Sequence, residues 1–358
     1  MKAAALVAFL AGSLGLAQEA STGFELSTTI TAGAFYSNQL SQFPRDGAPV
    51  DGGFRALFYP TLKLSSHWAL TGAIQERSRP FFAQDFDSQN YGLRTDVLEA
   101  HLDYSRFGKK SSIVVRLGVL PTAFGSFLAR YDDMRNPLTQ MPAAYGYYYK
   151  PVSTQGLMGA QVDATLGGAD FRAQFVNSSP ANRRSIFDRE QYGSWAGGAG
   201  YTIRQGFRVG VSAFRGPYLD RHYPFFFPGE ARPRGLPGSG YGIDVALGHG
   251  PWNVYGELQR FQMTYRAIPD FNQHTGYVEA RRVLSPRWYL AERVEYVRAN
   301  AFPGYQTYET AAGFRPNTRQ LIKVGYQIQQ GAAIRGSLAN VAEVQVVTTL
   351  PSFSLARD

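Results

Sequence analysis

Residue types that could act in catalysis or metal binding are scarce in this sequence and are poorly spaced for either task. The chain has no cysteine and five histidines, and no His-Glu-x-x-His motif or other zinc-binding spacing is present. No Gly-x-Ser-x-Gly motif marks a nucleophile. The adjacent carboxylates Asp132 and Asp133 could suggest a glycosidase pair, but neighbouring acids in a loop are usually solvated. We therefore expect neither enzymatic activity nor a cofactor.

Charged side chains occur instead within segments where apolar and polar residues alternate. In residues 207–214 the odd positions are Phe, Val, Val and Ala, whereas the even positions are Arg, Gly, Ser and Phe. A period of two is typical of β-strands with two different faces. The charged residues expected on the polar face of such segments are Arg55, Lys63, Arg116, Asp163, Arg172, Arg208, Asp244, Glu257, Arg293, Glu295, Arg315 and Lys323.

The alternation predicts sixteen strands over the whole chain. They are 24–36, 54–64, 67–77, 93–104, 112–120, 157–166, 170–177, 193–203, 207–215, 241–248, 252–261, 273–283, 288–298, 307–315, 319–329 and 340–350. Their connectors alternate between short ones, such as 204–206, and long ones, such as 216–240. This plan is typical of an antiparallel transmembrane β-barrel with short periplasmic turns and long extracellular loops.

The placement of charge and aromatic residues supports a barrel more than a soluble sandwich. A sandwich could not bury so many charged side chains in its core, whereas a wide barrel has a watery lumen. Aromatic residues on the apolar face gather near the strand ends, as in the girdles that lie at the two membrane interfaces. Near the short turns these are Trp68, Tyr104, Tyr201, Phe207, Trp252, Trp288 and Phe314, and near the long loops Tyr36, Phe54, Trp195, Tyr241, Tyr296 and Tyr308.

The composition and the N-terminus predict export. Apolar residues make up 44% of the chain and charged residues 18%, with 38 glycines and a mean hydropathy of -0.25, which excludes a disordered chain and a helical membrane bundle. Residues 1–17 have a basic start at Lys2, an apolar run from Ala3 to Ala11 and a small-residue end at Ala17, as in a cleaved signal peptide. The apolar run is shorter than the roughly 20 residues of a membrane-spanning helix. We expect one barrel over residues 18–358.

The net charge is +9 at pH 7, and it becomes +8 when Lys2 is removed with the signal peptide. Such an excess suits lipid headgroups or anionic solutes better than nucleic acid, because no basic helix or zinc-finger spacing is present. It also gives a slight preference for anions as permeating ions.

Two features make the sequence similar to a known family: the order of signal peptide, sixteen strands and a long connector after the fifth strand, and the octet from Gly118 to Gly125 (GVLPTAFG). It resembles bacterial outer-membrane porins, and more loosely the phosphate-selective porin family. The resemblance implies a homotrimer in the outer membrane that forms a water-filled channel for passive diffusion of small hydrophilic solutes or ions. It also implies that the long connector after the fifth strand, residues 121–155, narrows the pore.

This connector is rich in charge and tyrosine, and a loop of such length is uncommon unless it is functional. Together with inward-facing residues of the strands, it supplies the predicted pore-lining set. That set is Arg130, Asp132, Asp133, Arg135, Lys150, Arg55, Arg116, Arg172, Arg208 and Lys323.

Two other functions agree with parts of the sequence. An exported soluble all-β protein could bind or process carbohydrate on a platform formed by Phe225, Phe226 and Phe227. A barrel whose external loops bind a specific partner is also compatible with the strand pattern. Detergent-dependent solubility distinguishes the soluble protein from either barrel.

Overall fold

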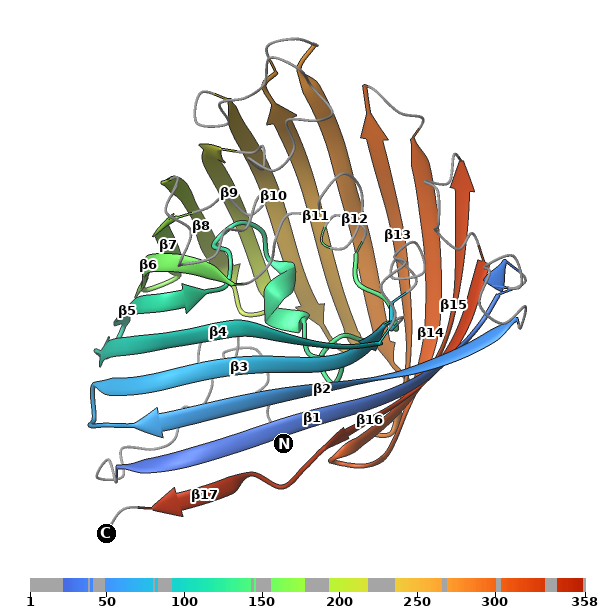
Figure 1. The fold of residues 1–358 in the computed structure, drawn as a ribbon, viewed down its shortest axis with the longest axis horizontal. Coiled ribbons are helices and arrows are strands. Elements are labelled where there is room, and N and C mark those ends of the chain that lie inside the picture. Colours follow the sequence, from blue (N-terminus) through green and yellow to red (C-terminus); the bar gives the residue numbers. More distant parts are fainter. Residues whose placement is uncertain are drawn as a thin grey trace.

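The described part of the chain forms one antiparallel sheet that closes into a barrel around a lumen (Figure 1). The computed structural model describes residues 22–37, 39–40, 49–79, 81–82, 92–142, 145, 156–177, 193–217, 236–265, 269–300, 304–331 and 340–356. The predicted signal peptide, residues 1–17, and the Phe225–Phe227 platform lie outside these residues.

Each strand pairs with its sequence neighbours, so the order in the sheet follows the chain. The strands of the first half are β1 (Gly23–Tyr36), β2 (Val50–Lys63), β3 (Trp68–Arg79), β4 (Gly92–Phe107), β5 (Ser111–Leu120), β6 (Leu157–Leu166), β7 (Ala169–Val176) and β8 (Ser194–Arg204). Those of the second half are β9 (Phe207–Pro217), β10 (Pro237–His249), β11 (Trp252–Met263), β12 (Phe271–Val283), β13 (Trp288–Ala299), β14 (Tyr305–Asn317), β15 (Gln320–Gly331), β16 (Asn340–Thr349) and β17 (Phe353–Ala356). Between β5 and β6 lies the 3-10 helix η3 (Phe127–Arg130).

The barrel closes at β1, which pairs with β2 on one edge and with the end of the chain on the other. Thr29–Tyr36 face β16, and Gly23–Leu26 face β17. Pro351 interrupts the last strand because proline has no N–H to donate to the ladder, so β16 and β17 are two parts of one strand position. The predicted barrel of about sixteen strands is therefore confirmed.

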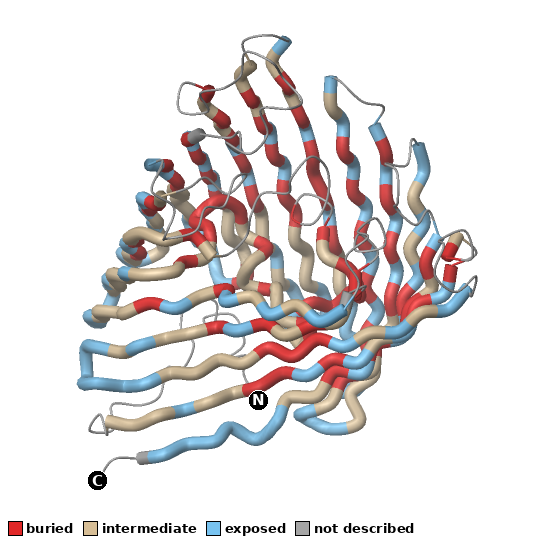
Figure 2. Tube along the Cα trace, viewed as in Figure 1, coloured by how far each residue is buried: buried red, intermediate tan, exposed pale blue. Residues whose placement is uncertain are grey.

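Side chains alternate between the outer surface and the lumen, as the period of two predicts. Buried and exposed residues alternate strictly along most of β13, and the alternation is visible along β10 to β15 in Figure 2. Leu117 and Val211, which we expected on the outer face, are 51% and 55% exposed. The outer face is thus apolar and open to the surroundings, the reverse of a soluble protein.

The expected aromatic girdles lie on this outer face. At the short-turn end, the exposed Trp68, Trp252 and Trp288 are accompanied by Tyr104 and Phe314, whose rings lie 5.0 Å from Trp68 and 4.6 Å from Trp288 respectively. Trp195 is exposed at the opposite end.

A bulge in β4 turns Leu98 inward, although the period-two pattern of residues 93–104 predicts it on the apolar outer face. In β4, Glu99 pairs with Ala73 and Val97 pairs with Ile74, so Leu98 is an extra residue in the strand. Leu98 turns into the lumen and packs against Leu57 and Ala73. The shift depends on the pairing with β3, so the β4 sequence alone does not reveal it.

Candidate functional site

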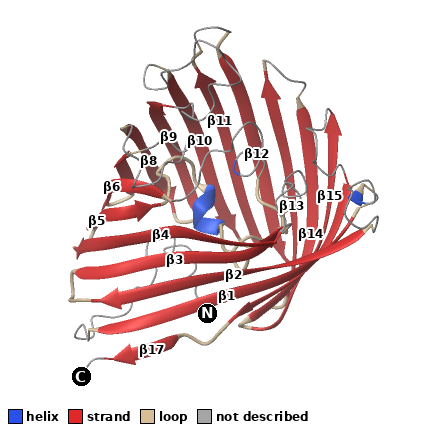
Figure 3. Ribbon diagram, viewed as in Figure 1, coloured by secondary structure: helices blue, strands red, loops and turns tan. Residues whose placement is uncertain are grey.

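The segment that follows β5 lies inside the barrel (Figures 1 and 3). We call residues 121–142 together with Tyr145 the inner loop. Gly125 has a positive φ of 81°, and a Cβ at this position would overlap the Tyr145 hydroxyl. This glycine therefore allows the loop to turn tightly beneath Tyr145. The remaining predicted loop residues, 143–144 and 146–155, lie outside the described residues and include Lys150.

The beginning of the inner loop packs on β7, β9 and β11. The Phe124 ring lies 5.1 Å from the Phe214 ring and 5.6 Å from the Phe261 ring. The Gln174 side-chain amide donates to the Pro121 carbonyl at 2.6 Å. Apolar contact and a hydrogen bond thus fix the point where the chain leaves the wall.

Glu257 of β11 is a buried acceptor for several loop and wall groups. Its carboxylate accepts hydrogen bonds from the hydroxyls of Tyr145 at 2.5 Å and Tyr277 at 3.2 Å, and from the Gln259 amide at 2.6 Å. Burial, with the nearby Glu257 charge, raises the pKa of the Tyr145 hydroxyl well above its ordinary value. Tyr145 therefore keeps its proton and acts as a donor.

Arg130, the last residue of η3, bonds the inner loop to β12. Its guanidinium is bonded to Glu279, donates to the Tyr277 hydroxyl at 2.9 Å and lies 3.8 Å from the centre of the Tyr255 ring. Burial by itself lowers the pKa of Arg130, but the neighbouring Glu279 carboxylate outweighs it, so this pKa is raised. The Arg130 guanidinium therefore stays charged, and the Glu279 carboxylate compensates its charge.

Arg293 of β13 continues this charge network toward β14. It contacts Glu295 at 3.0 Å, Glu309 at 2.5 Å and Glu279 at 3.4 Å. It also donates to the Gln140 carbonyl at 3.0 Å. A buried charge is tolerated only when it is paired and hydrogen-bonded, and here every donor group of the guanidinium faces an acceptor.

Lys323 of β15 is held by backbone carbonyls of the loop. Its ammonium donates to Leu138 at 2.8 Å, to Asp133 at 3.2 Å and to Asn136 at 3.4 Å. The turn from Asp133 to Leu138 therefore wraps around the end of one lysine side chain, which fixes the loop against this part of the wall.

The last anchor joins the loop to β1 and β2. The Asp133 carboxylate pairs with Arg55 at 2.8 Å and accepts from the Thr31 hydroxyl at 2.7 Å. The neighbouring Asp132 accepts from the Tyr59 hydroxyl at 2.8 Å. From Gln174 of β7 to Arg55 of β2, the loop thus bonds to most of the lumen wall.

The predicted pore-lining residues consequently fall into three groups. Arg55, Arg130, Asp133 and Lys323 are buried between the loop and the wall, so they hold the loop and do not face water. Asp132 is partly exposed and Arg135 is exposed on the loop.

The third group consists of Arg116, Arg172 and Arg208, which project inward from β5, β7 and β9. Arg116 is bonded to Asp163, and Arg208 lies between Asp170 and Asp244 at 2.6 Å from each. Arg172 reaches the Gly125 carbonyl of the loop at 3.5 Å. All three remain partly exposed, so this side of the lumen has charged groups within reach of water.

Sequence reasoning missed several loop anchors. Glu279, Glu309 and Glu343 lie at polar-face positions of strands whose alternation was recognised, so their inward direction could have been inferred. Their role as anchors of the inner loop could not have been inferred, because each contacts a loop residue more than a hundred positions away in the chain.

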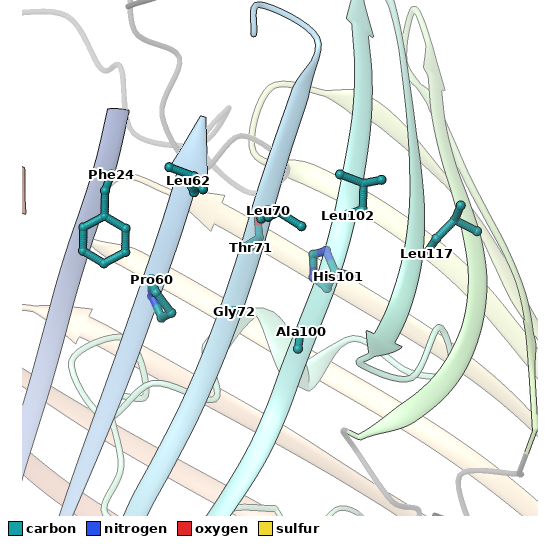
Figure 4. Close-up of a pocket in the computed structure, with 10 residues that line it drawn as sticks. All are labelled: Phe24, Pro60, Leu62, Leu70, Thr71, Gly72, Ala100, His101, Leu102 and Leu117. Atoms are coloured by element: carbon teal, nitrogen blue, oxygen red, sulfur yellow. The ribbon is translucent and has the colours of Figure 1, made fainter. Parts of the chain in front are cut away.

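A hollow of about 470 Å³ lies on the barrel wall, outside the lumen site (Figure 4). It forms where Pro60, Gly72 and Ala100 are smaller than the surrounding Leu70 and Leu102. Its lining is mostly apolar, and it has no grouping of chemically reactive side chains.

Among the described residues, no helix is long and apolar enough to span a membrane. No three or more His, Asp or Glu side chains in the described ranges are grouped so that they could hold a metal ion.

Comparison with solved structures supports the fold. OprB of Pseudomonas putida superimposes with a TM-score of 0.63 at 10% identity, over 92% of this chain and 94% of OprB. OmpT of Vibrio cholerae, in a trimer form, gives 0.61 at 10% identity, over 92% and 100% of the two chains. An anion-selective porin from Comamonas acidovorans gives 0.57 at 12% identity, over 93% and 100%.

At these identities the likeness defines the class of fold, a porin-like barrel. No protein-family model and no curated protein matches the sequence.

Proposed function

We propose that this chain is an outer-membrane porin that forms a water-filled channel for passive diffusion of small hydrophilic solutes. The apolar outer face between two aromatic girdles matches a barrel surrounded by lipid. Closure of the sheet pairs each of the described strands β1 to β16 with a neighbour on both sides, as a surrounding solvent without hydrogen-bond partners requires. The porin-like fold of the neighbours supports the same function.

The observation that carries the proposal is the inner loop fixed inside a closed barrel. A loop bonded to Arg55, Glu279 and Lys323 of the wall narrows the lumen without relying on flexible contacts. Partly exposed Arg116 of β5 and Arg208 of β9 supply charged groups that keep the path hydrated. The function is transport through a pore, with no catalytic step.

Localisation and assembly are part of the proposal. With an exported N-terminus, the short turns face the periplasm and the long loops face outward. We propose a homotrimer, in line with the trimer form of the OmpT neighbour. The narrower likeness to phosphate-selective porins and the slight preference for anions stay predictions.

The test is reconstitution of the purified chain in a planar lipid bilayer. Stepwise conductance increases are the expected result, and a salt gradient across the bilayer then gives the charge preference from the reversal potential. A chain that stays soluble without detergent and produces no conductance steps would favour the soluble carbohydrate-binding alternative.

A further inference from the structure

The short-turn end of the barrel carries an uncompensated ring of basic side chains. Seven short connectors form this end: 64–67, 108–110, 167–168, 205–206, 250–251, 284–287 and 318–319. In these connectors and the two strand residues on either side, the only carboxylate is Asp170, which pairs with Arg208 inside the lumen. The exposed basic residues that remain form what we call the basic rim: Lys63, Arg106, Lys109, Lys110, Arg204, Arg282, Arg287 and Arg319.

None of these eight side chains forms an ion pair with a described residue. Farther from the turns, Glu25 of β1, Asp103 of β4 and Glu292 of β13 are nearby carboxylates among the described residues, and none of them forms an ion pair with a described rim side chain. The rim is therefore a concentrated positive charge with little internal compensation.

The position of the basic rim relative to the aromatic girdle indicates what it meets. Trp68, Trp252 and Trp288 mark the level at which an apolar environment gives way to water. The Arg282 guanidinium lies 5.3 Å from the centre of the Trp252 ring, which places one rim charge directly at that level. Lys109 and Lys110 lie at the tip of a turn, and Arg287 is in another. Lipid headgroups occupy this layer around a membrane barrel.

From this juxtaposition we infer that the basic rim binds anionic phospholipid headgroups, so that this end of the barrel selects phosphatidylglycerol-like lipids over zwitterionic ones. The inference rests on the proposed membrane location. Lysine and arginine close to an anionic membrane surface attract it, and the attraction corresponds to roughly fivefold in binding per charge. The selectivity is electrostatic and decreases with added salt.

The fluorescence of the four tryptophans allows lipid contact at the basic rim to be measured separately from lipid contact at the long-loop end of the barrel. Three of them, Trp68, Trp252 and Trp288, lie at the basic rim, and Trp195 lies at the opposite end. A Trp195→Phe variant therefore reports on lipids at the basic rim alone. A variant with the other three changed to Phe reports on the long-loop end.

The experiment places the Trp195→Phe protein in phosphatidylcholine vesicles containing an equal mole fraction of either brominated phosphatidylglycerol or brominated phosphatidylcholine. Bromine quenches tryptophan fluorescence on contact. Brominated phosphatidylglycerol should quench more strongly at low salt, and the difference should shrink at high salt. Changing Lys109, Lys110 and Arg287 to Gln should lower the relative affinity for the anionic lipid at least tenfold, as an order of magnitude.

Two controls separate charge from structure. The variant with Lys109→Arg, Lys110→Arg and Arg287→Lys keeps the charges and should keep the preference. In the background where only Trp195 remains, the three Gln changes should leave quenching unaltered, which shows an intact barrel.

Equal quenching by the two brominated lipids in the Trp195→Phe protein, or a preference that survives the three Gln changes, overturns the inference. Loss of the preference on adding inorganic phosphate, but not on adding sodium chloride to the same ionic strength, would assign the rim to free anions and also overturn it. Absence of quenching by either lipid would show that the chain does not enter vesicles, which contradicts the proposed porin function itself.

Discussion

Individual charged residues in this barrel have roles that depend on whether the inner loop covers them. Arg55 and Arg208 both project inward from strands, yet Arg55 is completely buried against Asp133 while Arg208 remains partly open to the lumen. A buried pair is strongly affected when one partner is removed, because the other charge is left without compensation. Substitutions of the same type at neighbouring positions should therefore differ widely.

Asp133 and Asp132 provide such a comparison. Asp133→Asn removes the charge that compensates Arg55 and should destabilise the anchored loop by about 3 to 5 kcal/mol. Asp132→Asn weakens one hydrogen bond from Tyr59 and should have an effect of about 1 kcal/mol. Denaturant unfolding of the reconstituted protein measures both, and similar losses in the two variants would contradict the assigned anchor.

Tyr145 should give the loop a dependence on alkaline pH. Its pKa is raised in the folded protein, so its contribution to stability is complete below the ordinary value of about 10 and decreases as the pH rises beyond it. Current recordings at increasing pH should show an open-channel current that is steady at neutral pH and fluctuates more strongly above about pH 10. Tyr145→Phe should show noise already at neutral pH, because it lacks the hydrogen bond to Glu257. A Tyr145→Phe channel as quiet as the unmodified protein would refute this anchor.

At the scale of elements, each strand has an outer face and a lumen-side face, and the two faces tolerate different substitutions. The alternation alone predicts that arginine at Gly118 or Ser212, on the inward face, is milder than arginine at Leu117 or Val211 on the outer face. The structure contradicts this expectation. Gly118 has a φ of 139° and a Cβ there would overlap the Ala100 carbonyl oxygen, and the buried Ser212 hydroxyl accepts from the Gly125 amide.

Strand β5 offers a better matched pair. Leu117→Arg puts a charge on the outer face near the middle of the strand and should destabilise the barrel by roughly 2 to 4 kcal/mol. Val114→Arg lies on the inner face of the same strand, opposite Asp163, and should be much milder. Unfolding in lipid vesicles gives both values, and equal effects would show that the face assignment is wrong.

The inner loop is the element that should determine conductance. Deleting residues 132–140 removes the turn around Lys323 and the partner of Arg55, and the freed side chains can be hydrated in a wider lumen. Single-channel conductance should therefore increase while the barrel stays folded. Shortening the connector 178–192 between β7 and β8 by nine residues is the matched control and should leave conductance nearly unchanged. The same conductance after both deletions would place the constriction elsewhere.

At the scale of the whole molecule, the alternation of short turns and long loops defines two ends of the barrel. The basic rim belongs to the short-turn end, so the orientation in the membrane decides which leaflet it meets. The proposed orientation has this end in the periplasm.

The absence of cysteine makes the orientation directly measurable. A single cysteine introduced at Glu230, in the long connector after β9, should react on intact cells with a thiol reagent that does not cross membranes. A cysteine at Thr318, in the turn before β15, should react only after the outer membrane is disrupted. Labelling of Thr318→Cys alone on intact cells would invert the topology.

The sequence by itself determined the strands, their faces and the closure into a large barrel, because each depends on a local period of two and on connector length. Every predicted segment coincides with a strand of the structure, and the missed β17 continues the last one beyond Pro351. The sequence pattern did not predict the bulge at Leu98, because the bulge depends on how β4 pairs with β3. Only the tertiary structure decided which inward charges hold the loop and which face water. Asp133 is 78 positions from Arg55 and 190 from Lys323, so their contacts exist only after the barrel has closed around the loop.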